Sequence, residues 1–520
     1  MPTPSQLRRF LDPQFVSELG NMELIARLVV EGTVQEQLRD FRSLARSWWR
    51  GGLESARRLQ MRYGPPLRRR AMRLYFQGLR LVRRGRLAMG GTDTRGTELA
   101  ADVLGRSPTL LDPLPLIDRR LYSFPPLTDP SLLIGRDPDR VWLTNQFARW
   151  TEGSCPPVVL TGAMAVGHTS LLNVVAQELS PENSDVQVLR VVPSTRYLDE
   201  AGVAGRMARS LWGDEADGLR REFTDAGTSG PEGSEGSEAS DGSPVWTFLD
   251  LEKVLRGRGE QRVVFLERLE HFLIRVPGGC SLTERFLAFQ SRTATQVFWV
   301  NSVSDPAWKL LTTSEPHAAG LVQIRHLEPP DRKTLEELLL IRHSRSGVPL
   351  EFVEPMDLNP LVRRKLKRAR TDKDRQDVLR SDYFDWIFRA SQGNVLMAIL
   401  MWLRSADFTS RPGWLRLKPS KAIRFAFLEE MDLPTSFALK AFLEHESLTL
   451  GEYCRVFAVP YDEGFQALEV LRRKVLIDRL DTPGGLPVPV RRLEDEVRYR
   501  IPPIITQVIA QNLGEQNILH

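Results

Sequence analysis

The stretch PVVLTGAMAVGHTSLLNVVAQEL, residues 157–179, decides the fold of this chain. A β-rich run ends at Gly162, a short loop follows, and a helical run begins directly after Gly167. The spacing of the two glycines and Thr169, between a strand and a helix, matches a Walker A loop, in which backbone N–H groups and the helix N-terminus surround phosphate. We therefore predict a nucleotide site in this loop. Its predicted ligand-binding residues are Gly162, Gly167, His168, Thr169 and Ser170.

Histidine stands where this loop usually carries lysine. His168 is shorter than lysine and largely neutral at physiological pH. Because phosphoryl transfer depends on positive charge held at the phosphates, the substitution predicts weak or lost hydrolysis, whereas binding of ATP can survive it. The alternative is an ordinary glycine-containing turn between a strand and a helix.

Two further β-rich runs carry polar residues where the chemistry would need them. The run RVVFLE ends at Glu267, where a Walker B strand usually ends in aspartate, and Arg268 takes the next position, where many ATPases have a catalytic glutamate. The run QVFWVN ends at Asn301, a candidate sensor of the γ-phosphate. We predict Glu267 and Asn301 as catalytic residues, and Thr169 with Glu267 as the Mg²⁺ ligands. Ordinary surface charge at the end of a buried strand is the alternative for Glu267.

The β-rich runs alternate with helical ones, a pattern that predicts an α/β fold with a mostly parallel sheet. We assign residues 131–326 to this P-loop domain. Within it, residues 214–244 are acidic and rich in Gly and Ser, so we expect a disordered insert. Residues 327–410 are predicted to form a helical lid. Residues 425–515 show short helices followed by two strand-like runs, the order of a winged helix.

These motifs together resemble the STAND and origin-recognition-like branch of AAA-type P-loop NTPases, over residues 132 to about 480. The matching segments are LLIGRDPDRVWLTNQF, GAMAVGHTSLL, VVFLERLEHF, FWVNS, HLEPPDRKTLEELLLIRH and ASQGNVLMAILMW. The resemblance implies ATP and Mg²⁺ as cofactors, a helical lid, a C-terminal winged helix, and a nucleotide-dependent regulatory switch or assembly ATPase, often oligomeric. The departures at His168, Glu267 and Arg268 imply a slow ATPase or a pseudo-ATPase.

Charge is distributed unevenly along the chain, although the net charge is only +5. The segment from Arg42 to Arg86 holds fourteen arginines and one acid, within an Arg-rich helical region at residues 1–130. This stripe suits nucleic-acid phosphates, an anionic membrane surface or an acidic protein partner, and the three remain open. The candidate recognition helix at residues 461–474 begins with acids, which disfavours sequence-specific DNA binding and favours packing against the core.

Composition excludes several classes of protein. The apolar runs are too short to span a bilayer, and the N-terminus does not resemble a secretory signal. Three scattered cysteines give no disulfide framework or thiolate metal site, and the histidines lack metal-binding spacing. We expect a cytoplasmic protein, with peripheral membrane attachment as a variant. The two functional hypotheses are a nucleotide-binding switch with a protein partner or self-association, and a non-enzymatic scaffold that recruits a protein, DNA or a membrane.

Overall fold

The computed structural model describes the second part of the chain. The described residues are 121–122, 125–153, 155–179, 186–224, 245–355, 358–407, 410, 413–419, 428, 431–480 and 497–519. The arginine stripe from Arg42 to Arg86 lies outside these residues, so its three interpretations stay predictions.

The described elements follow one another as listed here. The α-helices are α7 (Asp137–Thr151), α8 (His168–Leu179), α9 (Glu200–Trp212), α10 (Ala216–Thr224), α11 (Phe248–Arg258), α12 (Ser281–Arg292), α13 (Asp305–Ser314), α14 (Arg332–Ser344), α15 (Pro360–Arg368), α16 (Asp372–Ser391), α17 (Val395–Ser405), α18 (Leu433–His445), α19 (Leu450–Phe457), α20 (Tyr461–Arg473) and α22 (Pro503–Glu515). The strands are β1 (Val158–Gly162), β2 (Gln187–Val191), β3 (Arg262–Leu266), β4 (Val297–Ser304), β5 (Gln323–Leu327), β6 (Leu350–Phe352), β7 (Ala406–Asp407), β8 (Leu415–Leu417), β9 (Ser447–Thr449), β10 (Asp478–Leu480) and β11 (Arg498–Arg500). Short 3-10 helices are η2 (Pro130–Leu132), η3 (Gly213–Glu215), η5 (Leu269–Phe272) and η6 (Pro316–Leu321).

A five-stranded sheet forms the centre of the first domain, in the order β2-β3-β4-β1-β5. All four strand pairs are parallel, which confirms the predicted α/β class, and the three β-rich runs described above form β1, β3 and β4. The sequence did not predict β5, which forms the edge beside β1. Because the strands are parallel, their carboxyl ends meet at one edge of the sheet, where α/β proteins bind ligands.

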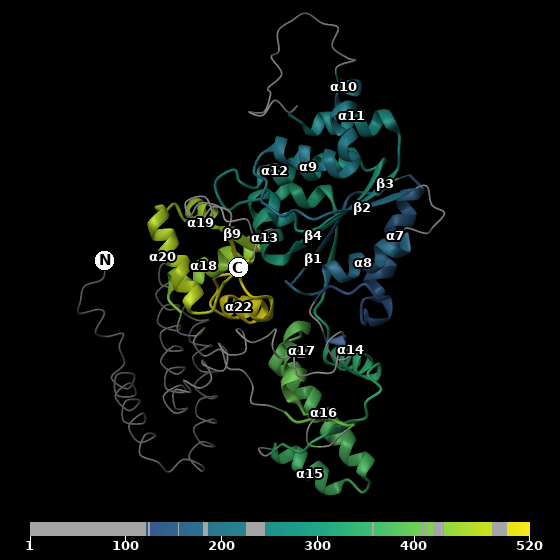
Figure 1. Ribbon diagram of the computed structural model, residues 1–520, viewed down its shortest axis with the longest axis vertical. Helices are drawn as coiled ribbons and strands as arrows, with labels where there is room; N and C mark the ends of the chain where they lie inside the picture. Colours follow the sequence, from purple (N-terminus) through teal and green to yellow (C-terminus); the bar gives the residue numbers. More distant parts are fainter. Residues whose placement is uncertain are drawn as a thin grey trace, which may run out of the picture. The chain divides into compact units, whose positions relative to one another are not determined.

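Alternate strand residues feed two separate hydrophobic layers. Val159, Val264 and Trp299 pack with α9, α11 and α12, whereas Leu160 and Phe265 pack with α7 and α8. Figure 1 shows these two sets of helices on opposite faces of the sheet. The period of two along a strand explains why the β-rich runs are apolar throughout: both faces are covered.

The first part of the predicted disordered insert is helical. Residues 213–224 form η3 and α10, so the prediction for residues 214–224 is wrong. Leu219 and Phe223 are apolar at helical spacing, and both pack against the sheet's hydrophobic layer. The acids of this segment lie at positions other than the apolar ones. Its composition is therefore acidic although one face of the helix is apolar, and composition alone led to the wrong prediction of disorder. Residues 225–244 lie outside the described part of the chain.

Two smaller units follow the sheet domain. The middle region, residues 332–419, packs α14, α16 and α17 around Trp402, and adds a mixed sheet in the order β6-β8-β7 that the sequence did not predict. We call residues 431–519 the C-terminal unit. There α18, α19, α20 and α22 cover an antiparallel sheet in the order β10-β11-β9. The name winged helix stays a prediction for this unit. Among the described helices, none has the length and apolar character that a bilayer span requires.

Candidate functional site

The loop between β1 and α8 has the backbone of a phosphate-binding turn. Gly167 has φ +106°, in the left-handed region that favours glycine, and Ala165 has φ +63°. A side chain at Gly162 would come within 3.0 Å of the Leu327 carbonyl oxygen, so glycine is needed there as well. Arg136 donates a hydrogen bond of 2.9 Å to the Val166 carbonyl and holds the loop from outside. The loop therefore presents backbone N–H groups and the start of α8 at the carboxyl edge of the sheet.

Ser170, a predicted ligand-binding residue, is used by the chain itself. Its hydroxyl accepts a hydrogen bond of 3.0 Å from the Leu127 backbone N–H. Asn173, one turn later, donates to the Leu127 carbonyl at 2.8 Å. The segment before η2 is thus fixed over the first turn of α8, and the Ser170 hydroxyl has a structural role.

His168 folds back toward β1. Its Cε1 would lie 3.2 Å from a Cβ placed on Gly162, and its buried Nε2 has no hydrogen-bond partner among the described residues. Burial, helped by the nearby charges of Arg136 and His326 and opposed by a bond to the Thr161 backbone, lowers the pKa of His168 to about 4. The imidazole is therefore neutral at physiological pH, so this position supplies no charge for the phosphates.

The predicted Mg²⁺ ligands are in contact with each other. The Thr169 hydroxyl donates to one Glu267 carboxylate oxygen at 2.5 Å, and the Arg190 guanidinium donates to the other. Arg190 also donates to the Asn173 side chain. Both carboxylate oxygens are engaged, one of them by a permanent cation, so this donor set as arranged does not fit Mg²⁺. One sign of Arg190 is visible in the sequence, because it is the charged residue inside the β-rich run VQVLRVV at residues 186–192.

Asn301 is not at the end of its strand, because β4 continues to Ser304. Its side chain is fully buried and exchanges two hydrogen bonds of 2.9 Å with the Gln290 side chain of α12. It also donates to the Val158 carbonyl at 3.1 Å. The predicted position at a strand end is therefore wrong, and the amide pairs within the core, as a buried amide must. The role of Asn301 as a sensor of the γ-phosphate stays a prediction.

Other polar residues, missed in the sequence, line the carboxyl edge of the sheet. Thr161 lies 3.2 Å from His326, measured between the hydroxyl oxygen and Nδ1. His326 Nδ1 is also 3.2 Å from a carboxylate oxygen of Asp305, the first residue of α13. The buried Ser304 hydroxyl has no partner among the described residues, and Ser304 is in register with Gly162. These residues come from β1, β4 and β5, which only the fold brings together.

The residues after β3 contact the C-terminal unit. Arg268 has φ +60° and ψ +56°, and its Nε lies 3.4 Å from a Glu446 carboxylate oxygen. His271 Nε2 is 3.4 Å from the other Glu446 oxygen. Burial and the charge of Glu446 raise the pKa of the Glu270 carboxyl to about 8. The side chain at the usual position of a catalytic glutamate is therefore an arginine directed to another part of the chain.

Arg196 is the most buried link between the sheet domain and the C-terminal unit. Its guanidinium donates to the carbonyls of Glu270 and Leu273 on one side, the latter at 2.6 Å. On the other side it donates to the carbonyls of His445 and Ser447, at 2.9 and 2.7 Å. Its side chain is 1% exposed, so all these bonds are made away from water.

Two more contacts join the same surfaces. The Arg275 backbone N–H donates to His445 Nε2 at 2.9 Å, and its guanidinium is 3.0 Å from Glu444. Met164, within the phosphate-binding loop, packs against the hydrophobic cluster of the C-terminal unit. The C-terminal unit thus touches both the loop and the segment after β3.

Comparison with protein-family models gives no match, and neither does comparison with curated proteins. Among solved structures, the chain is similar to Cdc6p from Pyrobaculum aerophilum, at 16% identity and a TM-score of 0.35, over 76% of this chain and 98% of that one. It is similar to the Aeropyrum pernix ORC1 protein, solved in complex with DNA, at 16% identity and 0.34, over 77% and 97%. A RuvB variant from Thermotoga maritima matches at 16% identity and 0.31, over 69% and 93%. At these identities the likenesses concern the fold alone.

Proposed function

We propose that the chain is a nucleotide-dependent switch that binds ATP in the loop at residues 162–170 and hydrolyses it slowly or not at all. The observation that carries the proposal is the double contact of the C-terminal unit. One contact is Met164 in the loop, and the other is the pair of Arg268 with Glu446 directly after β3. A ligand that fixes the loop changes the surface on which the C-terminal unit packs, and this gives the differential contact that a switch needs.

Slow turnover follows from the same residues. His168 is neutral, so the loop lacks the positive charge that stabilises a phosphoryl transition state. Arg268 is directed to Glu446 and offers no carboxylate to orient a water. Both features leave binding intact, because backbone N–H groups and the N-terminus of α8 remain available for phosphate.

The test is ATP binding by the purified full-length chain and by Gly167→Asp, which adds a negative charge at a position of positive φ. Gly278→Asp is the matched control, because Gly278 also has positive φ, at +72°, but lies in an exposed loop after η5. We expect Gly167→Asp to abolish binding and Gly278→Asp to leave it unchanged. Equal binding by all three proteins would remove the switch from consideration.

The alternative is a non-enzymatic scaffold, which the buried contacts of Arg196 favour. These bonds hold the C-terminal unit in place without any ligand. If no nucleotide binds, and the chain is retained on DNA or anionic vesicles in a salt-sensitive way that is lost on deletion of residues 42–86, the scaffold is the better account.

A further inference from the structure

The first inference concerns the cation of the nucleotide site and rests on the proposed function. Glu267 is almost fully buried, and its two oxygens are taken by the Thr169 hydroxyl and the Arg190 guanidinium. A divalent ion between Thr169 and Glu267 would have to displace both. The Arg190 guanidinium keeps its charge at every physiological pH, so the site already holds a cation where the resemblance places Mg²⁺.

The fold explains how Arg190 reaches this position. Arg190 in β2 is in register with Phe265 of β3, whose side chain packs on the α8 face of the sheet. On that face Arg190 meets both Glu267, which follows β3, and Asn173 of α8. The Arg190 side chain is 41% exposed, so one side of the guanidinium remains open to solvent and to an anion.

We propose that Arg190 takes the place of the magnesium ion, and that this site binds a nucleoside triphosphate without a divalent cation. The open guanidinium edge provides the positive charge near Thr169 that neither His168 nor a metal supplies. No metal is then needed to neutralise Glu267.

The test is titration of the full-length chain with a fluorescent ATP analogue, in EDTA and in excess Mg²⁺. We expect affinities that agree within about twofold for the native chain. Arg190→Gln should bind roughly tenfold more weakly in EDTA and regain affinity with Mg²⁺, which can then reach Glu267. Arg190→Lys keeps the charge and should remain independent of Mg²⁺, and the exposed Arg209→Gln on α9 is the matched control.

The outcomes separate the two proposals. Native binding that requires Mg²⁺, or an Arg190→Gln variant that binds normally in EDTA, would overturn the role of Arg190 and leave the switch standing. Absence of binding in both buffers would overturn the switch and this inference together.

A second, independent inference concerns α15 in the middle region. Between Asn359 and Thr371 the chain has six cations and no acid. Val362 and Leu366 pack into the core of the middle region, and the cations occupy the remaining faces. These exposed residues are Arg363, Arg364, Lys365, Lys367, Arg368 and Arg370. Among the residues that the structure describes, they form no ion pair.

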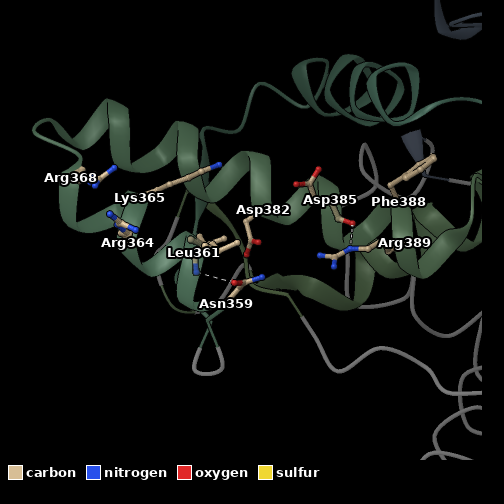
Figure 2. Close-up of a pocket in the computed structure, with 10 residues that line it drawn as sticks. Asn359, Leu361, Arg364, Lys365, Arg368, Asp382, Asp385, Phe388 and Arg389 are labelled. Atoms are coloured by element: carbon tan, nitrogen blue, oxygen red, sulfur yellow. Dashed lines mark hydrogen bonds between the residues drawn. The ribbon is translucent and has the colours of Figure 1, made fainter. Parts of the chain in front are cut away.

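A pocket of about 690 Å³ lies beside this helix. Figure 2 shows Arg364, Lys365 and Arg368 on α15, with Asp382 and Asp385 on α16. Asp385 is already paired with Arg332. The basic wall of the pocket is therefore largely uncompensated, and it calls for an anionic partner.

The charge density favours a nucleic acid over the other polyanions. Nine helical residues span about 14 Å. A duplex presents one phosphate per about 1.7 Å of axis, whereas residues 225–244 of this chain carry five acids in twenty residues. An interfacial membrane helix needs a broad free apolar face, but Val362 and Leu366 of α15 pack inward and Leu361 is exposed by itself among the cations. The geometry points to α15 as a contact surface for the phosphate backbone of a nucleic acid, independent of nucleotide binding.

The test compares two full-length triple variants in binding to a short DNA duplex at several salt concentrations. One carries Arg364→Gln, Lys365→Gln and Arg368→Gln. The control carries Arg149→Gln, Arg209→Gln and Lys253→Gln, at exposed cations of α7, α9 and α11, with the same change of charge. We expect the α15 variant to reduce the slope of log affinity against log salt by about two to three, and the control to change it by less than about one.

Three results would overturn this inference. The first is an unchanged slope for an α15 variant whose melting temperature equals that of the native chain. The second is an equal change in the control. The third is an unchanged DNA slope combined with lost binding to anionic vesicles or to a peptide of residues 225–244, which would assign the surface to another partner.

Discussion

Arg196→Met is expected to loosen the C-terminal unit from the sheet domain. The variant keeps an unbranched apolar stem but removes the guanidinium and its donors. Two of those donors cross to the C-terminal unit, at 2.9 Å to His445 and 2.7 Å to Ser447. A hydrogen bond from a charged donor contributes at least about 1.5 kcal/mol, so the docked state should lose about 3 kcal/mol.

This figure leaves out the pair of Arg196 with Glu452. Glu452 keeps Arg498, at 2.8 and 3.2 Å, after the substitution, so no orphaned buried carboxylate adds to the loss. A change of about 3 kcal/mol raises the population of the undocked state about 150-fold.

Hydrogen exchange of the full-length chain, resolved to single amides, measures this population. The Arg275 amide is bonded to His445 Nε2 across the interface and should exchange about 150-fold faster in the variant. The Tyr197 amide, bonded to the His271 carbonyl within the sheet domain, should change far less. The exposed Arg209→Met on α9 serves as the control. Equal acceleration at Tyr197 and Arg275 would mean local unfolding of the Arg196 segment, and no acceleration at Arg275 would mean that Arg196 does not hold the unit; either result refutes the reasoning.

Three further predictions concern the buried polar groups. Burial lowers the pKa of His168 to about 4, so the stability that this residue contributes is present above pH 6.5 and is lost as the pH falls toward 4. By pH 5 the free energy of unfolding of His168→Gln, measured in urea, should therefore have fallen by about 2 kcal/mol less than that of the native chain. Burial and Glu446 raise the pKa of Glu270 to about 8, so the stability that this carboxyl contributes is present below pH 4.5 and is lost as the pH rises through 8. The melting temperature of Glu270→Gln should therefore exceed that of the native chain by an amount that grows toward alkaline pH. A difference that stays constant with pH would count against the burial of Glu270. Asn301→Leu should cost about 2 kcal/mol of stability, since Gln290 loses its partner, and leave ATP affinity unchanged; normal stability with lost ATP affinity would instead support Asn301 as a sensor of the γ-phosphate.

Local pattern was enough to predict the central strands and the loop. The runs that became β1 to β4 are rich in β-branched and apolar residues because both faces of the sheet are covered. Gly162 and Gly167 are required by close approach and by positive φ, two constraints that act within a few residues of chain. Such short-range requirements leave a trace in the sequence.

The remainder depends on contacts between distant segments. β5, at residues 323–327, is an edge strand of sequence QIRHL, which is neither apolar throughout nor strictly alternating, so its run is hard to separate from a loop. The pair of Arg190 with Glu267 joins residues 77 positions apart, and the bond of Arg196 to Ser447 spans 251. Asn301 is a polar residue after an apolar run, so in the sequence it resembles a strand-end residue. Only the position of Gln290 shows that its amide belongs to the core. No local periodicity encodes such partners.

The distribution of positive charge favours a switch over a fast ATPase. Arg136, Arg190, Arg196 and Arg268 all lie near the loop or the segment after β3, and each already has protein partners. A fast enzyme keeps its charges free and aimed at the transition state. Here a phosphate that draws on Arg190 competes with Glu267, and a movement of the loop disturbs Met164 in the C-terminal unit's cluster. Linkage between two sites is reciprocal. If nucleotide binding favours release of the C-terminal unit, then release of that unit raises the affinity for nucleotide by the same factor. Shared contacts of this kind couple two sites and slow chemistry, and His168 removes the remaining charge that turnover would need.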